Sequence, residues 1–220
     1  MHLRHLFIRI VRSYRNNGLL PTLSQFFLYI RRIALQNRYI IYCSELMELT
    51  DEKPRAAPNI IIECNKIETD ISEEDKKIME LFLYKEIFQD QLKVRFSKGA
   101  FIWLVKQDSS LAGFVWSIVQ TTVEPYFFPL TKKDVHIFDN VIFPEYRGRG
   151  INTILINHVL FELKRMGFVR AFIETHTWNT SEIKSLIKTH FYRLAEARKF
   201  HFWGWCLSTW SRTTIKPLNN

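Results

Sequence analysis

The hydrophobic pattern is clearest between residues 134 and 166, where it predicts a strand, a tight turn and a helix. The run 135–143 is rich in β-branched and aromatic residues, which is typical of a buried strand, and Pro144 ends it. Gly148 and Gly150 then permit backbone conformations that a Cβ disfavours. Apolar residues recur at helical spacing in the segment that follows, namely Ile151, Ile154, Leu155, Val159, Leu160 and Leu163.

The start of this predicted helix has the features of a phosphate site. The first N–H groups of a helix have no partner within it, and the positive end of the helix dipole lies there. Arg147 and Arg149 flank the turn and add positive charge. The turn 147–152 is therefore predicted to hold a pyrophosphate. Its glycine spacing differs from that of a P-loop and from the Gly-x-Gly-x-x-Gly of a dinucleotide fold.

The rest of the pattern predicts a mixture of strands and helices, and so an α/β (α+β) fold class. Strands are expected at 39–49, 59–63, 101–105, 111–118, 169–176, 192–199 and 200–210. One helix is expected after Ser72, and another after Asn179 or Thr180, because each of these residues can cap a helix N-terminus. The long aromatic connection 124–133 could form one wall of an acceptor pocket.

The turn resembles the coenzyme A signature of the GNAT acetyltransferase superfamily, Gln/Arg-x-x-Gly-x-Gly/Ala. Arg147 and Gly150 match this signature, while Asn152 replaces its final small residue. In that family a hairpin precedes the turn, and a strand, an Asn-x-x-Ser-like segment and a helix ending at Gly-Phe follow it. Residues 178–181 and His190-Phe191 stand at the last two of these positions. The resemblance extends from about residue 59 to 210.

The resemblance implies a mixed, mostly antiparallel sheet flanked by helices. It also implies transfer of an acetyl group from acetyl-CoA to an amine of a small-molecule acceptor, by direct attack on the thioester. The residues implied in coenzyme binding are Val141, Ile142, Phe143, Arg147, Gly148, Arg149, Gly150, Ile151, Asn152 and Asn179. The backbone of 141–143 would pair with the pantetheine amides and supply an oxyanion donor, and Asn179 would contact the pantetheine arm.

Three residues are candidates for the base that removes the proton of the amine. Asp139 ranks first, because many family members carry an acidic base on this strand. Glu174 and His176 are two apart on a strand, so they share a face and could form a carboxylate–imidazole pair. Each has a structural alternative: Asp139 could stabilise a strand bulge, and His176 could be a structural histidine with Glu174 as its partner.

The proton donor for the leaving thiolate is harder to assign. Many family members carry a tyrosine four residues before the Gly-Phe glycine, and Leu186 stands at that position here. Tyr192, just beyond the helix, is the candidate substitute.

Positive charge is concentrated at the N-terminus. Residues 1–44 contain seven arginines and no Asp or Glu, so that of the net charge of +9 only 9 − 7 = +2 remains for the rest of the chain. The pattern predicts a basic amphipathic helical hairpin at 1–38. It could pack on the catalytic domain, bind an anionic membrane surface, or dock an acidic protein such as an acyl carrier protein; nucleic acid is the least expected partner.

Three domain segments are expected: 1–49 with the hairpin and a connecting strand, 59–210 as the transferase domain, and 211–220 as a tail. A cytoplasmic location is expected, with a membrane-peripheral one as the alternative, because no apolar run is long enough to span a membrane. The three cysteines are scattered without metal-ligand spacing, so no metal is expected. Two other functions stay open, namely N-acylation with longer chains from acyl-CoA or acyl carrier protein, and non-catalytic acyl-CoA binding.

Overall fold

The computed structural model describes residues 18, 38–52, 54, 58–83, 85–122, 126–202 and 205–215. The chain divides into two compact units, Met1–Arg38 and Tyr39–Asn220. Apart from Gly18 and Arg38, the helical hairpin expected at 1–38 lies outside the described residues.

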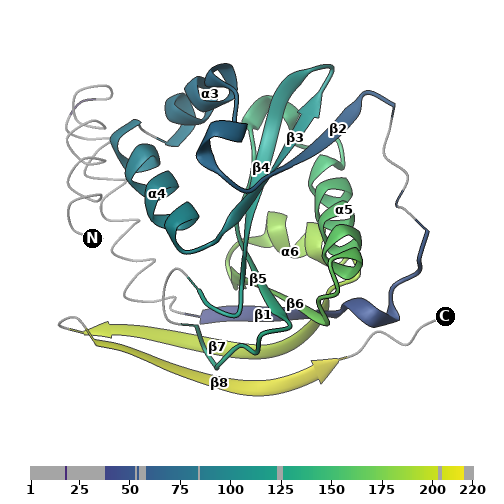
Figure 1. The fold of residues 1–220 in the computed structure, drawn as a ribbon. Helices are drawn as coiled ribbons and strands as arrows, with labels where there is room; N and C mark the ends of the chain where they lie inside the picture. The colour runs from purple at the N-terminus through teal and green to yellow at the C-terminus, as the bar shows by residue number, and fades with distance from the viewer. Residues whose placement is uncertain are drawn as a thin grey trace. The chain divides into compact units, whose positions relative to one another are not determined.

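Eight strands form one sheet in the order β2-β3-β4-β5-β6-β1-β7-β8 (Figure 1). The strands are β1 (Arg38–Glu45), β2 (Ile60–Asn65), β3 (Phe101–Gln107), β4 (Ser110–Val119), β5 (Asp134–Ile142), β6 (Arg170–His176), β7 (Tyr192–Phe202) and β8 (Trp205–Ile215). β5 and β6 are parallel, whereas β1–β6, β2–β3, β3–β4, β4–β5 and β7–β8 are antiparallel pairs. The mixed, mostly antiparallel sheet is thereby confirmed.

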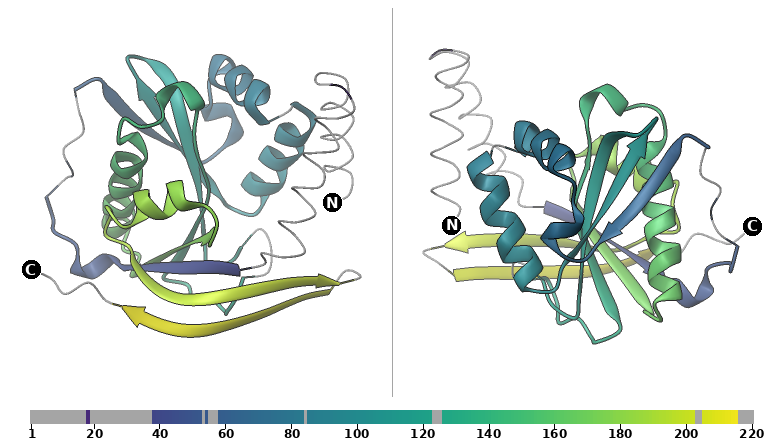
Figure 2. Two further views of the ribbon diagram at one scale, coloured as in Figure 1. Left: turned by 180° about the vertical axis from the view of Figure 1, so that it is seen from behind. Right: turned by 45° about the horizontal axis from the view of Figure 1, so that its top comes forward.

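Helices cover both faces of this sheet (Figure 2). They are α3 (Glu73–Leu83), α4 (Lys85–Ser97), α5 (Ile151–Arg165) and α6 (Thr180–Leu186), with short 3-10 turns η1 (Leu46–Glu48), η2 (Glu68–Asp70) and η3 (Pro144–Tyr146). Core residues of α5 and α6 pack on one face, and those of α3 and α4 pack on the other. Because β3 and β4 are covered on both sides, they read as continuous apolar runs rather than as alternating ones.

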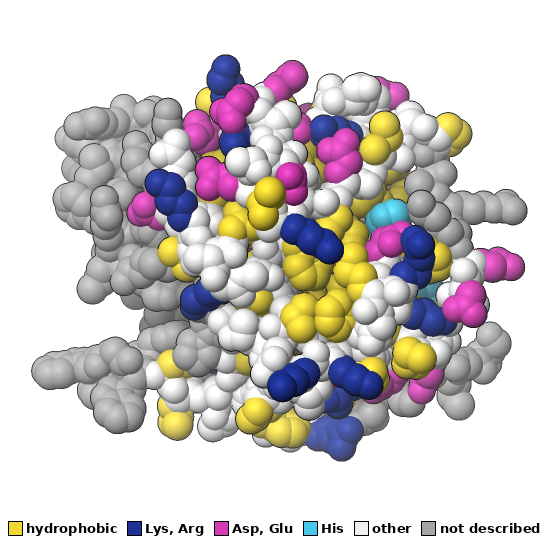
Figure 3. Space-filling model, viewed as in Figure 1, with side chains coloured by type: hydrophobic (Ala, Val, Ile, Leu, Met, Phe, Trp, Pro, Cys, Tyr) yellow, Lys and Arg dark blue, Asp and Glu magenta, His cyan; other side chains and the backbone are white. Residues whose placement is uncertain are grey.

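Some hydrophobic side chains on the α5-covered face of the sheet are visible at the surface. Hydrophobic side chains gather near the middle of the face in Figure 3, between β2 and α5. The partly buried side chains of Ile60, Ile62 and Cys64 on β2 pack against the α5 core there. β2 is therefore an edge strand that still contributes to the core.

The observed elements differ from the sequence prediction at several points. β1 ends at Glu45 and lies inside the sheet between β6 and β7, so it does not merely connect the hairpin to the transferase domain. β7 continues to Phe202, and β8 runs from Trp205 to Ile215, beyond the expected limit of 210. Helix α4 was not predicted, because its buried apolar residues, such as Phe88 and Leu92, are separated by many charged and polar ones.

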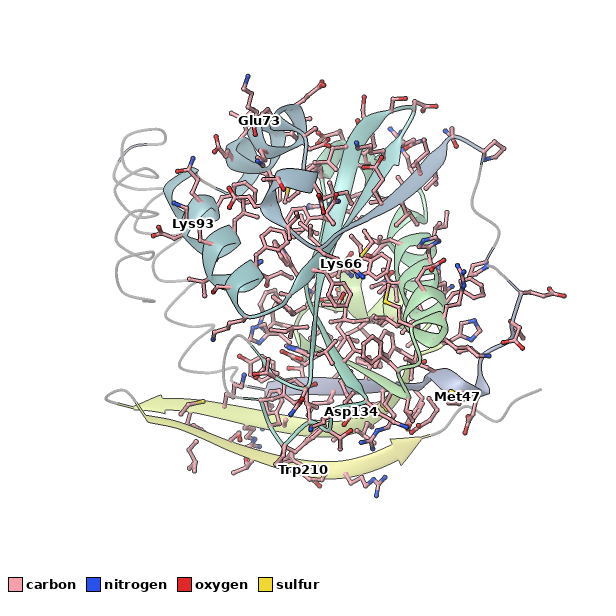
Figure 4. The ribbon with its side chains drawn as sticks, in the orientation of Figure 1. Met47, Lys66, Glu73, Lys93, Asp134 and Trp210 are labelled. Carbon is pink, nitrogen blue, oxygen red and sulfur yellow. The ribbon has the colours of Figure 1, made fainter. Side chains whose placement is uncertain are left out.

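β5 and β6 are held together at one end and part at the other. Their register runs from Asp134 opposite Arg170 to Ile137 opposite Ile173. Asp134, low in the view of Figure 4, accepts two hydrogen bonds from the Arg170 guanidinium, at 2.8 and 2.9 Å. Burial alone would raise the pKa of Asp134, but its bonds to Arg170 and Thr131 lower it. This partly buried ion pair holds β5 and β6 together at the end where they pair.

A β-bulge accompanies the parting of the strands. On β4, Phe114 and Trp116 are two residues apart, whereas their partners on β5, Val141 and Phe138, are three apart. The extra residue on β5 bends the strand, as bulges do. Asp139 lies within it and has a left-handed backbone with φ of 47°. The bulge therefore marks the point where the sheet opens.

Close contact between β4 and β5 depends on Gly113. A Cβ on Gly113 would lie 2.3 Å from the carbonyl oxygen of Val141 and 3.0 Å from the Cα of Ile142. We expect Gly113→Ala to lower the free energy of unfolding by about 3 kcal/mol, because backbone must move to relieve the overlap. Urea unfolding measures this, with Ser110→Ala at the exposed start of the same strand as control. Unchanged stability would contradict so close an approach of the two strands.

Candidate active site

An open cleft of about 500 Å³ lies where β5 and β6 part. One wall consists of residues 140–142 and the turn that leads into α5, and the other consists of Asn179 and α6. Eight of the ten residues expected to bind the coenzyme line this cleft: Val141, Ile142, Arg147, Gly148, Gly150, Ile151, Asn152 and Asn179. The other two, Phe143 and Arg149, do not line it.

The glycines of the turn have the backbone that the pattern predicted. Gly148 and Gly150 have φ of 78° and 77°, a region that L side chains rarely adopt. A Cβ at either position would meet no atom within 4 Å, so the space beside them is open. Gly150 caps α5 without a side chain, and the first helical residues after it line the cleft. The turn therefore presents helix-start N–H groups to this space.

The cations of the site come from both walls. Arg147 lines the cleft and donates from Nε to the carbonyl oxygen of Ile142 at 2.9 Å. Arg149 instead bonds the side chain of Gln107 at 3.3 Å and lies over the ring of Tyr146. Lys184 and Lys188, which the sequence interpretation missed, line the opposite wall. Three cations thus line the cleft, namely Arg147, Lys184 and Lys188, but Arg149 is not one of them.

Fewer residues of β5 present their backbone to the cleft than the sequence predicted. Phe143 is 2% exposed, and its amide N–H donates to the carbonyl oxygen of Ala112 on β4 at 2.9 Å. The polar groups of successive residues in an antiparallel ladder alternate in direction, so those of Ile142 point away from β4. The expectation that the Phe143 backbone faces the coenzyme is therefore wrong. Ile142 offers its backbone to the cleft.

A partly buried carboxyl, that of Glu182, lines the cleft. Glu182 Oε2 accepts hydrogen bonds from Thr175 Oγ1 at 2.7 Å and from Asn179 Nδ2 at 2.8 Å. Burial raises the pKa of Glu182, and the charges of Glu174 and Asp139 raise it further. The hydrogen bond from Thr175 and the contact with the Asn140 amide lower the pKa of Glu182, but by less than burial and these charges raise it.

Asn140 is poorly satisfied at this point. Its carboxamide meets Glu182 closely enough to lower the pKa of that carboxyl. Yet among the described residues neither buried amide atom has a well-formed hydrogen-bond partner. A buried polar group of this kind costs about 1–3 kcal/mol when left unpaired, so it is suited to bind a ligand.

Sequence reasoning missed Glu182 as a site residue, although one signal was present. Asn179 caps α6 as predicted, accepting from the N–H of Glu182 at 3.4 Å. The spacing Asn-x-x-Glu is that of a capping box, which by itself indicates a helix start rather than chemistry.

Glu174 forms a carboxylate–imidazole pair, but with a different histidine from the one expected. Its Oε2 lies 2.9 Å from Nε2 of His136 on β5. Burial would raise the pKa of Glu174, but His136, aided by Lys199 and Tyr126, lowers it. The predicted pairing with His176 is wrong, because the parallel register places His136 opposite Phe172 and so beside Glu174.

His176 belongs to an aromatic stack. Its ring lies 4.3 Å from that of Tyr39 and 5.1 Å from that of Trp178, measured between centroids. The aromatic connection 124–133, which was predicted as a possible wall of an acceptor pocket, contributes to the core. Phe127 in it is 5% exposed and belongs to the core formed with β1, β6 and β7. Tyr126 of the same connection contacts the pair of Glu174 and His136, since its ring centroid lies 4.7 Å from that of His136.

Asp139 is paired with a buried cation. Its side chain, 53% exposed, forms an ion pair with Arg95 of α4, which is 7% exposed. The Arg95 guanidinium lies over the rings of Trp116 and Phe138, at 5.0 and 5.2 Å. This contact favours the bulge-stabilising role of Asp139 over the role of base.

Tyr192 lies away from the cleft. It belongs to the cluster of Ile41 and Cys43, and its hydroxyl donates to Glu45 at 3.1 Å. Burial, together with Cys43 and Glu45, raises the pKa of Tyr192. Tyr192 is not among the residues that line the cleft, so the structure adds no support to its prediction as a proton donor there. Leu186, at the usual tyrosine position, is fully buried in the core.

Two negative findings concern the described residues. Within them, no group of three or more His, Cys, Asp or Glu side chains could hold a metal ion. Among the helices of the same part of the chain, none has the length and apolarity needed to cross a membrane.

Comparison with known proteins places this geometry in a family. The sequence profile of the acetyltransferase (GNAT) family matches residues 64–192. A search of curated proteins found no match.

Three solved structures have similar folds, each with a TM-score of 0.51. A conserved protein of unknown function from Staphylococcus epidermidis is 11% identical, over 78% of this chain and 64% of its own. A GNAT-family acetyltransferase from Colwellia psychrerythraea is 8% identical, over 71% and 52%. A tandem GNAT protein from the clavulanic acid biosynthesis pathway is 13% identical, over 72% and 51%. The chain thus spans about half to two thirds of their lengths. The profile match covers more than half of this chain and agrees with the fold and the glycine turn, so the chain belongs to the acetyltransferase (GNAT) family.

Proposed function

We propose that this protein transfers an acetyl group from acetyl-CoA to an amine of a small-molecule acceptor, by direct attack of the amine on the thioester. One observation carries this proposal: the cleft joins a glycine turn at a helix start to the partly buried carboxyl of Glu182. The first feature suits a pyrophosphate, and the second suits proton transfer.

The residues of the cleft fit acetyl-CoA along its length. The N–H groups of the turn, with Arg147, Lys184 and Lys188, supply donors and positive charge for the phosphates. The outward-facing backbone of Ile142 suits a pantetheine amide, and Asn179 lies on the opposite wall. A thioester at the inner end would lie beside the poorly satisfied amide of Asn140. That amide can donate a hydrogen bond to the oxygen that becomes negative during attack.

Glu174 is the best-placed base for the amine. It begins the stretch of β6 beyond its pairing with β5, and its carboxylate is bonded to His136, which fixes its orientation. Asp139 is engaged by Arg95, and His176 is held in an aromatic stack. We therefore place Glu174 ahead of both.

Removing this base should slow turnover strongly. We expect Glu174→Gln to lower kcat by about 10²- to 10⁴-fold, the usual range for loss of general-base catalysis. The Kd of coenzyme A should stay within about twofold, because Glu174 does not line the donor cleft. Stopped assays of thiol release give kcat, and calorimetry gives Kd. A variant with full turnover would remove Glu174 from this role.

The proposed function is tested by titrating the protein with acetyl-CoA, coenzyme A and a long-chain acyl-CoA, and then assaying thiol release with a panel of small amines. Binding of acetyl-CoA with amine-dependent release of thiol supports acetyl transfer. Preference for the long chain would favour the longer-acyl alternative, and binding without any turnover would favour a binding module. Binding of none of the three would contradict the donor site itself.

Two further parts of the hypothesis concern the setting of the enzyme. A cytoplasmic location is consistent with three free cysteines, Cys43, Cys64 and Cys206. Docking of an anionic membrane surface or of an acyl carrier protein through residues 1–38 stays a hypothesis drawn from the sequence charge alone.

A further inference from the structure

We infer that Glu182 donates the proton that the departing thiolate takes up, at a site where the family's usual tyrosine position is filled by Leu186. This inference rests on the proposed acetyl transfer. It assigns a catalytic role to a residue that sequence reasoning did not select.

The position of Glu182 is the first support. It lies in the first turn of α6 and lines the cleft near Asn140, on the wall opposite β5. The hydrogen bonds that its side chain accepts from Thr175 and Asn179 both go to the same oxygen, Oε2. These two bonds hold the carboxyl in place through one of its oxygens.

The charges around the site are the second support. Burial favours the protonated form of Glu182, and the nearby carboxylates Glu174 and Asp139 favour it further, so its pKa is raised. His136 lowers the pKa of Glu174. The environments therefore separate the pKa values of the two carboxyls. Glu182 tends to carry a proton, and Glu174 tends to be ionised and able to accept one. Such separation is the usual mark of an acid and a base serving one reaction.

The reaction then balances without any further reagent. The amine nitrogen forms a bond to the thioester carbon, and the amine proton passes to Glu174. The bond between that carbon and the sulfur breaks, and the sulfur takes the proton of Glu182. The products are the amide and the free thiol. Glu174 then loses its proton to water and Glu182 regains one, which restores the starting state.

A purely structural role for Glu182 is the competing explanation, because Asn179 caps α6 by accepting from the Glu182 N–H and its side-chain amide donates to the Glu182 carboxyl. Glutamine also serves at this position of a capping box. Its amide oxygen can still accept from Thr175 and Asn179. Glu182→Gln therefore keeps the cap and removes the transferable proton.

Thr175 offers an independent test through the same carboxyl. Its hydroxyl donates to Glu182 and lowers the pKa of that group. Thr175→Val removes this bond with little change in shape, so it should raise the pKa of Glu182. Thr175→Ser keeps the hydroxyl and is the matched control.

The experiment measures kcat for acetyl-CoA against pH in the wild type and these three variants, with calorimetry of coenzyme A binding. We expect the wild-type kcat to fall at alkaline pH as Glu182 loses its proton. Thr175→Val should move this fall to higher pH, and Thr175→Ser should leave it in place. Glu182→Gln should abolish the fall and lower the maximal kcat by about 10²-fold, with the Kd of coenzyme A within about twofold.

The outcomes separate this inference from the proposed function. If wild type turns over acetyl-CoA and Glu182→Gln keeps its kcat and its alkaline fall, the inference is overturned and acetyl transfer stands. If wild type binds acetyl-CoA but turns over no amine, the proposed function itself fails. Should Glu182→Gln not fold, the Thr175 pair decides: identical pH profiles for the valine and serine variants overturn the inference.

Discussion

Gly150→Glu should raise the Kd of acetyl-CoA and of coenzyme A by at least about 100-fold, which corresponds to ~2.7 kcal/mol. Gly150 has φ of 77° and caps α5, and the space beside it is open. A glutamate there would place a carboxylate where the pyrophosphate is proposed to lie. It would also compete for the same N–H groups and for Arg147.

Backbone strain is separated from this effect by a matched variant. Gly99, after α4, has φ of 76°, and a Cβ there would likewise meet no atom within 4 Å, but Gly99 does not line the cleft. Gly99→Glu should therefore carry a similar strain and leave the Kd unchanged. Calorimetry of both variants decides the matter: wild-type affinity in Gly150→Glu would show that phosphate does not bind at this turn.

Asp139→Asn should lower the free energy of unfolding by about 1–2 kcal/mol, because it removes the countercharge of a buried guanidinium while Asp139 itself is half exposed and partly screened by water. Arg95 is 7% exposed and pairs with Asp139. Asparagine has nearly the same shape and tolerates the left-handed backbone that Asp139 adopts, so charge is the main change. Chemical denaturation measures the loss.

The double variant Arg95→Met/Asp139→Asn is the control for this interpretation. It removes both charges, and much of the lost stability should return. Turnover against pH gives a second test. If Asp139 were the base, the Asp139→Asn variant would no longer show the fall of kcat at acidic pH, and its stability would stay near that of the wild type. That result would restore Asp139 as the base and contradict the bulge-stabilising role.

The glycine turn and the helix start of the proposed donor site were predictable because they are adjacent in the sequence. The turn 147–152 and the helix after it contain both the glycines and the helix-start N–H groups, so local spacing was sufficient. Phe143 was assigned wrongly because the direction of a strand amide depends on the register with β4, which spacing does not reveal.

The catalytic side was harder to predict because it is assembled across strands and helices. Glu174 and His176 do share a face of β6, but the nearest imidazole comes from the parallel neighbour β5. Arg95 reaches Asp139 from a helix with a weak apolar pattern. Tyr192 was selected by its distance along the chain, whereas β7 carries it to β1.

The ion pair between Asp134 and Arg170 lies at the paired end of β5 and β6, so a small rotation there shifts the other end of β5. Beyond Ile137, five residues of β5 extend to Ile142 without pairing to β6, a length of about 16 Å at ~3.3 Å per residue. A rotation of about 5° at the paired end would shift the strand tip by more than ~1 Å, enough to cost on the order of 100-fold in rate when reacting groups are misplaced. The width of the cleft therefore depends on this ion pair as well as on the pairing of β5 with β4.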